Sequence, residues 1–113
     1  MPESSERGAL TEAVFYILLS AYSPIHGYAI MKNIIRLSKK RVVLGPGTLY
    51  GAINSLVEKG WLKSTDDIRD TRKKDYIITD DGKQVVLKEL ERLEELLENG
   101  KRIAGGAGNE NNN

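Results

Sequence analysis

Cysteine is absent from the sequence, and histidine occurs only once, at position 26. Without cysteine the chain has no disulfide scaffold, thiol nucleophile or thiolate metal site, and a single histidine excludes a site built from several imidazoles. The longest strongly apolar run, residues 13–21, is about half the length of a membrane-spanning helix. These absences predict a protein without a metal, another cofactor or membrane contact.

The start of the chain also lacks a targeting signal. Residues 1–7 do not have the basic and then apolar segments of a secretory leader, so we predict a cytoplasmic protein. The 113 residues suit one domain with a small core, which pairing with a second copy would enlarge. His26 has no natural partner group for acid–base catalysis, so we do not expect an enzyme.

The formal net charge of +1 conceals an uneven distribution of charge. Residues 32–74 carry 11 basic and 4 acidic side chains, whereas residues 1–31 have a net charge of −2 and residues 75–113 a net charge of −4. A basic middle segment in an otherwise acidic chain is typical of a nucleic-acid-binding surface. The charge pattern therefore favours double-stranded DNA as a partner.

Three helices are predicted in the first half of the chain. The first begins after Thr11 as N-cap and has apolar residues three and four apart as far as Ala21. The second covers residues 27–37, and the third extends from the turn at residues 45–47 to about Lys59. Between them, the apolar residues 42–44 form either a short strand or a buried linker.

The second half predicts a β-hairpin and one more helix. Residues 61–64 and 73–78 are the strands, joined by a polar, charged loop, and Thr79 caps a helix that ends at Asn99-Gly100. An apolar seam with spacings of four, three and four residues follows this helix and consists of Val86, Leu90, Leu93 and Leu97. A homodimer would cover the seam, and the alternative is that it folds back on the first helix.

The predicted fold class is mainly α with a small β-hairpin. Three helices followed by a hairpin form a winged helix-turn-helix, to which a C-terminal dimerisation helix is added. The predicted divisions are a flexible N-terminus at residues 1–8, the winged-helix DNA-binding domain at 9–79, the dimerisation helix at 80–99 and a disordered tail at 100–113.

The third helix is the predicted reader of the major groove. Asn54 can pair bidentately with adenine, Thr48 and Ser55 can contact bases or phosphates, and Tyr50 can reach a phosphate through its hydroxyl. Cations from two loops are expected on phosphates: Lys39, Lys40, Arg69, Arg72, Lys73 and Lys74. The alternative for both sets is an ordinary solvated surface, because polar helix faces and charged loops are common.

Four strings of residues carry a family resemblance. They are Ile25-His26-Gly27-Tyr28; Gly47-Thr48-Leu49-Tyr50 followed by Ala52-Ile53-Asn54-Ser55-Leu56; Glu58-Lys59-Gly60-Trp61-Leu62; and Tyr76-Ile77-Ile78-Thr79-Asp80-Asp81-Gly82. Together they resemble the PadR family of bacterial transcriptional regulators over about residues 9–97. The resemblance implies a winged-helix domain, a C-terminal dimerisation helix, and a homodimer that binds a pseudo-palindromic operator, usually as a repressor.

The single short C-terminal helix resembles the small branch of that family, which includes multidrug-responsive regulators. In that branch an aromatic side chain of the last helix helps to hold planar drugs at the dimer interface, and here the last helix has no aromatic residue. Gly51 also stands where family members often have proline, and Asp75 stands where the strand usually begins with an aromatic residue.

We predict a sequence-specific DNA-binding transcriptional regulator, a homodimeric repressor that uses the third helix and the wing. One alternative is a ligand-gated repressor with an apolar pocket for a small-molecule effector at the dimer interface. Another is a winged-helix protein–protein adaptor that does not bind DNA. An apolar outer face on the third helix would mark the adaptor, and this face is polar. A small enzyme is a more distant alternative without a convergent catalytic set.

Overall fold

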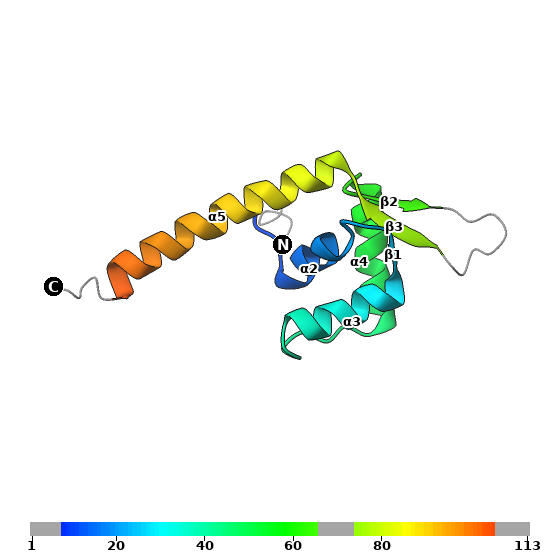
Figure 1. The fold of residues 1–113 in the computed structure, drawn as a ribbon, viewed down its shortest axis with the longest axis horizontal. Helices are drawn as coiled ribbons and strands as arrows, with labels where there is room; N and C mark the ends of the chain where they lie inside the picture. The colour runs from blue at the N-terminus through cyan, green and yellow to red at the C-terminus, as the bar shows by residue number, and fades with distance from the viewer. Residues whose placement is uncertain (1–7, 66–73, 106–113) are drawn as a thin grey trace.

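The computed structural model describes residues 8–65 and 74–105, which form four helices and a three-stranded antiparallel sheet (Figure 1). In chain order the elements are α2 (Glu12–Ser20), β1 (Ile25–His26), α3 (Gly27–Leu37), α4 (Pro46–Glu58), β2 (Leu62–Thr65), β3 (Asp75–Ile78) and α5 (Asp80–Ala104). The mainly helical composition is the predicted fold class. In Figure 1, α2, α3 and α4 gather beside the sheet, and α5 extends away from them along the upper edge of the molecule.

Two threonines begin helices where the sequence predicts N-caps. The side chain of Thr11 accepts a hydrogen bond from the Val14 amide at 3.1 Å, at the start of α2. The side chain of Thr79 accepts one from the Gly82 amide at 3.0 Å, at the start of α5. Each bond satisfies an amide that the helix itself leaves unpaired. Both predicted caps are therefore confirmed.

The sheet has one strand more than the predicted hairpin. β2 and β3 pair antiparallel, with Leu62 opposite Ile78, as predicted for the wing. On the other side of β3 lies β1, in which Ile25 is opposite Tyr76, so the strand order is β1-β3-β2. A two-residue strand has no alternation to detect, and its partner lies far along the chain. For this reason the sequence predicts no strand between the first two helices.

The segment between α3 and α4 is a linker and not a strand, and it is buried only in part, because Val43 is 65% exposed. Val42 and Leu44 are half-buried and pack against the core. The buried Ser38 accepts a hydrogen bond from the Val42 amide at 2.9 Å. Arg41 forms an ion pair with Glu12 of α2. The linker is thus anchored to the end of α3 and to α2 without strand pairing.

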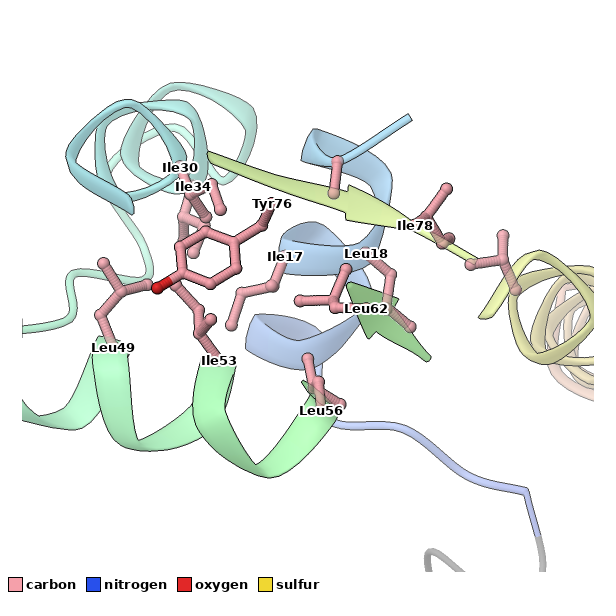
Figure 2. Packing of buried hydrophobic residues seen from close by; sticks show 12 residues of the cluster. Ile17, Leu18, Ile30, Ile34, Leu49, Ile53, Leu56, Leu62, Tyr76 and Ile78 are labelled. Carbon is pink, nitrogen blue, oxygen red and sulfur yellow. The ribbon is translucent and has the colours of Figure 1, made fainter. Parts of the chain in front are cut away.

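One hydrophobic core joins all four helices to the sheet (Figure 2). Its buried members are Ile17, Leu18 and Ala21 of the α2 region, Ile30 and Ile34 of α3, Leu49, Ile53 and Leu56 of α4, Leu62, Tyr76 and Ile78 of the sheet, and Val86 of α5. Figure 2 shows the ring of Tyr76 reaching from β3 toward α4. Burial raises the pKa of the Tyr76 phenol, and the nearby Tyr50 raises it further.

The predicted end of the last helix is wrong. α5 passes through Asn99 and Gly100 and continues to Ala104, with Gly105 as its C-cap. A glycine inside a helix costs only about 1 kcal/mol relative to alanine, which one interior position can tolerate. Lys101 and Arg102 in the last turn interact favourably with the negative end of the helix dipole. The predicted boundary between residues 80–99 and a tail from 100 therefore moves to the end of α5.

None of the helices in residues 8–65 and 74–105 combines the length and the hydropathy that crossing a membrane requires.

Candidate nucleic-acid interface

The outer face of α4 carries the predicted base-reading residues. The apolar side of this helix is buried through Leu49, Ile53 and Leu56. The predicted reading residues Thr48, Asn54 and Ser55 are all exposed. The helix thus separates a core side from a polar side, and the polar side presents amide and hydroxyl groups that can hydrogen-bond base edges or phosphates.

Two glycines make this outer face unusually thin. Apart from neighbouring atoms of its own helix, a Cβ atom added to Gly47 or Gly51 would meet no atom of the described residues within 4 Å. Packing within the chain therefore does not require glycine at either position. Glycine inside a helix also costs about 1 kcal/mol relative to alanine. The missing side chains allow another molecule to approach the α4 backbone closely.

The side chain of Tyr50 extends from α4 to the first turn of α3, and Tyr50 is 39% exposed. A Cβ atom added to Gly27 would overlap the hydroxyl end of the Tyr50 ring. Gly27 therefore makes room for Tyr50, which links the His-Gly-Tyr string to the Gly-Thr-Leu-Tyr string. The predicted phosphate contact of the Tyr50 hydroxyl would be made beside the first turn of α3.

The cations predicted on phosphates fall into two groups. Lys74 directly precedes β3 and is half-buried, whereas Arg69, Arg72 and Lys73 lie outside the described residues. The exposed Lys39 and Lys40 follow the end of α3. They line an open cavity of about 390 Å³ together with Lys32, Ile35 and Arg36. Sequence reasoning missed Lys32 and Arg36, although their four-residue spacing with Lys40 was a usable signal.

The backbone at Lys39 and Lys40 is strained. Their φ angles are 53° and 68°, in the left-handed region. That region costs a residue other than glycine roughly 1–2 kcal/mol. Four hydrogen bonds of this turn hold the conformation, among them Lys40 N to Ile35 O at 2.7 Å and Lys39 N to Arg36 O at 3.1 Å.

From Leu87 onward, α5 exposes an apolar surface. Of the predicted seam residues, Leu90, Leu93 and Leu97 are 46%, 40% and 57% exposed. The assignment of Val86 to this seam is corrected, because Val86 is 1% exposed and belongs to the core of its own chain. The reason is its position one turn after Gly82, where α5 still packs closely on the sheet and α2. The exposed α5 surface comprises Leu87, Leu90, Leu93, Leu96, Leu97 and Ile103.

Comparison with known protein families agrees with this arrangement. The model of the transcriptional regulator PadR-like family matches residues 14–89, two thirds of the chain. The chain belongs to the PadR-like family of transcriptional regulators. No curated protein matches it.

Solved structures agree with this assignment. RosR of H. salinarum is 25% identical with a TM-score of 0.66, and the match covers 84% of this chain and 79% of RosR. A transcriptional regulator from Clostridium thermocellum is 24% identical with a TM-score of 0.64, over 89% and 98% of the two chains. F93 from STIV, a winged-helix DNA-binding protein, is 20% identical with a TM-score of 0.53, over 82% and 89%. The last two show the fold alone. The PadR-like regulator is thus a winged-helix protein, in which β2 and β3 form the wing and α4 the second helix of the helix-turn-helix.

In this PadR-like regulator Glu89 connects α5 to the segment that precedes α2. The sequence pattern places Glu89 among the charged residues that surround the seam, but its side chain is only 3% exposed. It accepts hydrogen bonds from the Leu10 amide at 3.4 Å and from Arg92 Nε at 2.9 Å. The pKa of Glu89 is lowered, chiefly because Arg92 donates hydrogen bonds to the carboxylate and also because the Leu10 amide does. Burial acts in the opposite direction and raises this pKa.

A cavity of about 280 Å³ adjoins Glu89. Phe15 and Tyr16 of α2 line it together with Arg92 and Leu93 of α5. The PadR-like regulator therefore has aromatic walls beside the exposed α5 surface, although α5 itself contains no aromatic residue.

We expect Glu89→Gln to remove stability at pH 7, by about 1–3 kcal/mol, because Arg92 loses a charged partner. A carboxylate whose folded pKa is lowered stabilises the fold above its unfolded pKa. This stability is lost as the pH falls through the lowered folded pKa, so the difference between the wild type and the variant should be smaller in acid than at pH 7. Urea unfolding at pH 7 and pH 3.5, at one protein concentration, measures both. The exposed Glu91→Gln is the control, and equal losses in the two variants would contradict the role of Glu89.

Proposed function

We propose that this PadR-like transcriptional regulator is a homodimeric repressor that binds a pseudo-palindromic operator. α4 enters the major groove, and the wing lies along the neighbouring phosphates. The observation that carries the proposal is the outer face of α4, on which Thr48, Asn54 and Ser55 are exposed. Asn54 then reads adenine in the groove, and the two hydroxyls contact bases or phosphates.

The glycines of α4 support a close approach to DNA. No residue in the described part of the chain occupies the space that a Cβ atom of Gly47 or Gly51 would fill. A duplex in contact with this face would use that space for its own backbone or base edges. Tyr50 is the only large apolar side chain on α4 that is exposed in the described part of the chain. A protein–protein adaptor would need a more apolar face, so the observations favour DNA.

Cations on both sides of α4 support phosphate contacts. Lys39 and Lys40 lie in the linker before α4, and Lys74 lies at the start of β3. We assign phosphate contacts to these three residues, and from the sequence to Arg69, Arg72 and Lys73. Such contacts add affinity without sequence preference and make binding depend on salt.

The exposed leucines of α5 support the homodimer. Leu90, Leu93 and Leu97 lie three and four residues apart on a helix that extends beyond the rest of the molecule (Figure 1). A second α5 related by a two-fold axis would bury them, and the same axis would give the operator its symmetry.

An effector-responsive regulator is the second candidate function. The cavity beside Glu89 favours it, because Phe15 and Tyr16 offer aromatic walls next to the proposed dimer surface. An effector that fills this cavity should release the protein from the operator that selection from random duplex DNA recovers.

Selection from a pool of random duplex DNA at two salt concentrations tests the proposal. We expect enrichment of a two-fold-symmetric site whose half-sites lie about one helical turn, roughly 10 bp, apart. The absence of enrichment, with binding that vanishes at the higher salt, would reject sequence-specific recognition.

Asn54→Ala should relax the preference at one position of each half-site, by about 1–3 kcal/mol, because a bidentate base contact is lost. The same selection repeated with the variant measures this change. Asn99→Ala, which removes an exposed asparagine from α5, is the matched control and should retain the full site. An unchanged site with Asn54→Ala would show that another face of the protein reads the bases.

A further inference from the structure

A basic stripe follows the outer face of α3. Tyr28, Lys32, Arg36 and Lys40 are spaced four residues apart and are all exposed, on the side away from the buried Ile30 and Ile34. Within α3, which ends at Leu37, the stripe from Tyr28 to Arg36 is about 12 Å long at a helical rise of 1.5 Å per residue. Lys40 follows in the left-handed turn beyond the helix. Lys32 Nζ lies 5.3 Å from the centre of the Tyr28 ring, and Arg36 Nη2 donates to Asn33 Oδ1 at 2.9 Å.

The stripe ends at the open cavity of about 390 Å³. Four cations line it, Lys32, Arg36, Lys39 and Lys40, with the half-buried Ile35 between them. No carboxylate belongs to this lining among the described residues. Like charges four residues apart on a helix repel each other, so the free protein gains no stability from this cluster. A polyanion would relieve the repulsion, and the aliphatic lining would accept its apolar parts.

The turn at the end of α3 places two of these cations at a cost in backbone strain. Lys40 N donates to Ile35 O at 2.7 Å, and Lys39 N donates to Arg36 O at 3.1 Å. This pair of bonds is a Schellman motif, in which the residue after the C-cap is left-handed and usually glycine. Here that residue is Lys39, and the next one, Lys40, is left-handed as well. Lysine therefore stands where glycine would be physically easier.

We propose that the outer face of α3 and its strained last turn form a second DNA-backbone site, separate from the groove-reading face of α4. Lys32, Arg36, Lys39 and Lys40 hold consecutive phosphates of one strand, and Ile35 packs against deoxyribose. The left-handed turn is kept because it directs Lys39 and Lys40 into the same cavity as Lys32 and Arg36. This inference rests on the proposed function. Figure 1 supports it, because α3 lies on the edge of the molecule opposite α5 and leaves the proposed dimer surface free.

The double variant Lys32→Gln, Arg36→Gln tests the new residues. Each lost phosphate contact flattens the slope of log affinity against log salt by about 0.9. In the proposed dimer the double variant loses four contacts, so from 50 to 200 mM salt the wild type should lose about a hundredfold more affinity than the double variant. The loss of affinity at low salt should be the same for operator and random duplexes. The control is the double variant Lys83→Gln, Lys88→Gln on α5, which should keep the wild-type salt slope. If Lys32→Gln, Arg36→Gln also kept the wild-type slope, the proposal would be overturned.

Two variants at position 39 test the purpose of the strained turn. Lys39→Gly removes the cation and relieves the strain, so its melting temperature should rise while its affinity for DNA falls. Lys39→Ala removes the same cation and keeps the strain. Its affinity for DNA should therefore fall as far, but its melting temperature should not rise. Retention of wild-type affinity by Lys39→Gly would overturn the role of the lysine. A melting temperature of Lys39→Gly no higher than that of Lys39→Ala would overturn the claim of strain.

The two proposals fail in different ways. If the wild type binds no duplex DNA, the proposed function itself is wrong. If the wild type selects an operator and Asn54→Ala relaxes it, but Lys32→Gln, Arg36→Gln behaves like the wild type, only the second backbone site is wrong.

Discussion

Gly82→Ala should destabilise the protein by about 2–4 kcal/mol, although alanine is the better helix former. Gly82 is buried in the first turn of α5. An added Cβ atom would overlap the carbonyl oxygen of Trp61 and lie 2.7 Å from Cγ1 of Ile78. The first of these is a backbone atom and cannot rotate away, so either α5 or the α4–β2 connection must move.

Two hydrogen bonds make that movement costly in free energy. The Trp61 carbonyl accepts a bond from the Thr79 amide at 3.0 Å, and Thr79 Oγ1 donates to the Gly60 carbonyl at 2.6 Å. The start of α5 is therefore attached to the chain that leaves α4. A displacement of about half an ångström would strain both bonds and the N-cap of α5. The close approach at Gly82 lets the first turn of α5 pack against the α4–β2 connection and β3.

Urea unfolding followed by circular dichroism measures the effect, and Gly100→Ala is the control. Gly100 lies in the same helix, and a Cβ atom there would meet nothing within 4 Å. Its replacement should stabilise the protein by about 0.5–1 kcal/mol, through helix propensity alone. The same substitution in one helix is thus expected to have opposite signs at two positions. Stabilisation by both variants would contradict the packing at Gly82.

Leu90→Glu combined with Leu97→Glu should convert the protein into a folded monomer with operator affinity reduced about 100-fold or more. Both leucines are exposed within one chain, so the single domain does not need them for its core. In the proposed dimer they face a second α5, where four added carboxylates would be buried near one another. The two half-sites would then be bound independently, and the gain from linking two DNA-binding units would be lost.

Sedimentation equilibrium gives the oligomeric state, and operator titration gives the affinity. Gln84→Glu adds a carboxylate to an exposed position in the first half of α5 and serves as the control, because it lies outside the exposed α5 surface. It should remain dimeric. A double leucine variant that stays dimeric at micromolar concentration would place the dimer interface elsewhere. Circular dichroism must show unchanged helix content for the comparison to hold.

Much of the architecture could be predicted from local patterns. The N-caps Thr11 and Thr79, the apolar sides of α2, α3 and α4, and the strands of the wing depend on residues close together in the chain. The polar outer face of α4 is equally local, because residues 48, 54 and 55 lie outside its apolar stripe. The predicted reading face was therefore found where the sequence places it, although its contacts with DNA remain a proposal.

The structure revised the site where distant segments meet. β1 exists because β3 has an edge to pair with, and its own two residues carry no signal. Val86 and Glu89 lie at seam and flank positions by spacing, but both are buried because α5 packs against the sheet and α2 there. The cavity at Lys39 and Lys40 depends on the left-handed backbone conformation of both residues, which lysine rarely adopts. Helical periodicity contains no information about these arrangements.

The sequence by itself determined the order of the helices and of the two wing strands and the basic middle of the chain, because periodicity, capping and charge are properties of neighbouring residues. Its short residue strings also indicated the family. Only the tertiary structure decided which part of α5 is core and which part is free for a partner. It also decided which lysines share one surface. Both depend on how closely backbones approach each other, as at Gly82, and that distance results from packing across the whole chain.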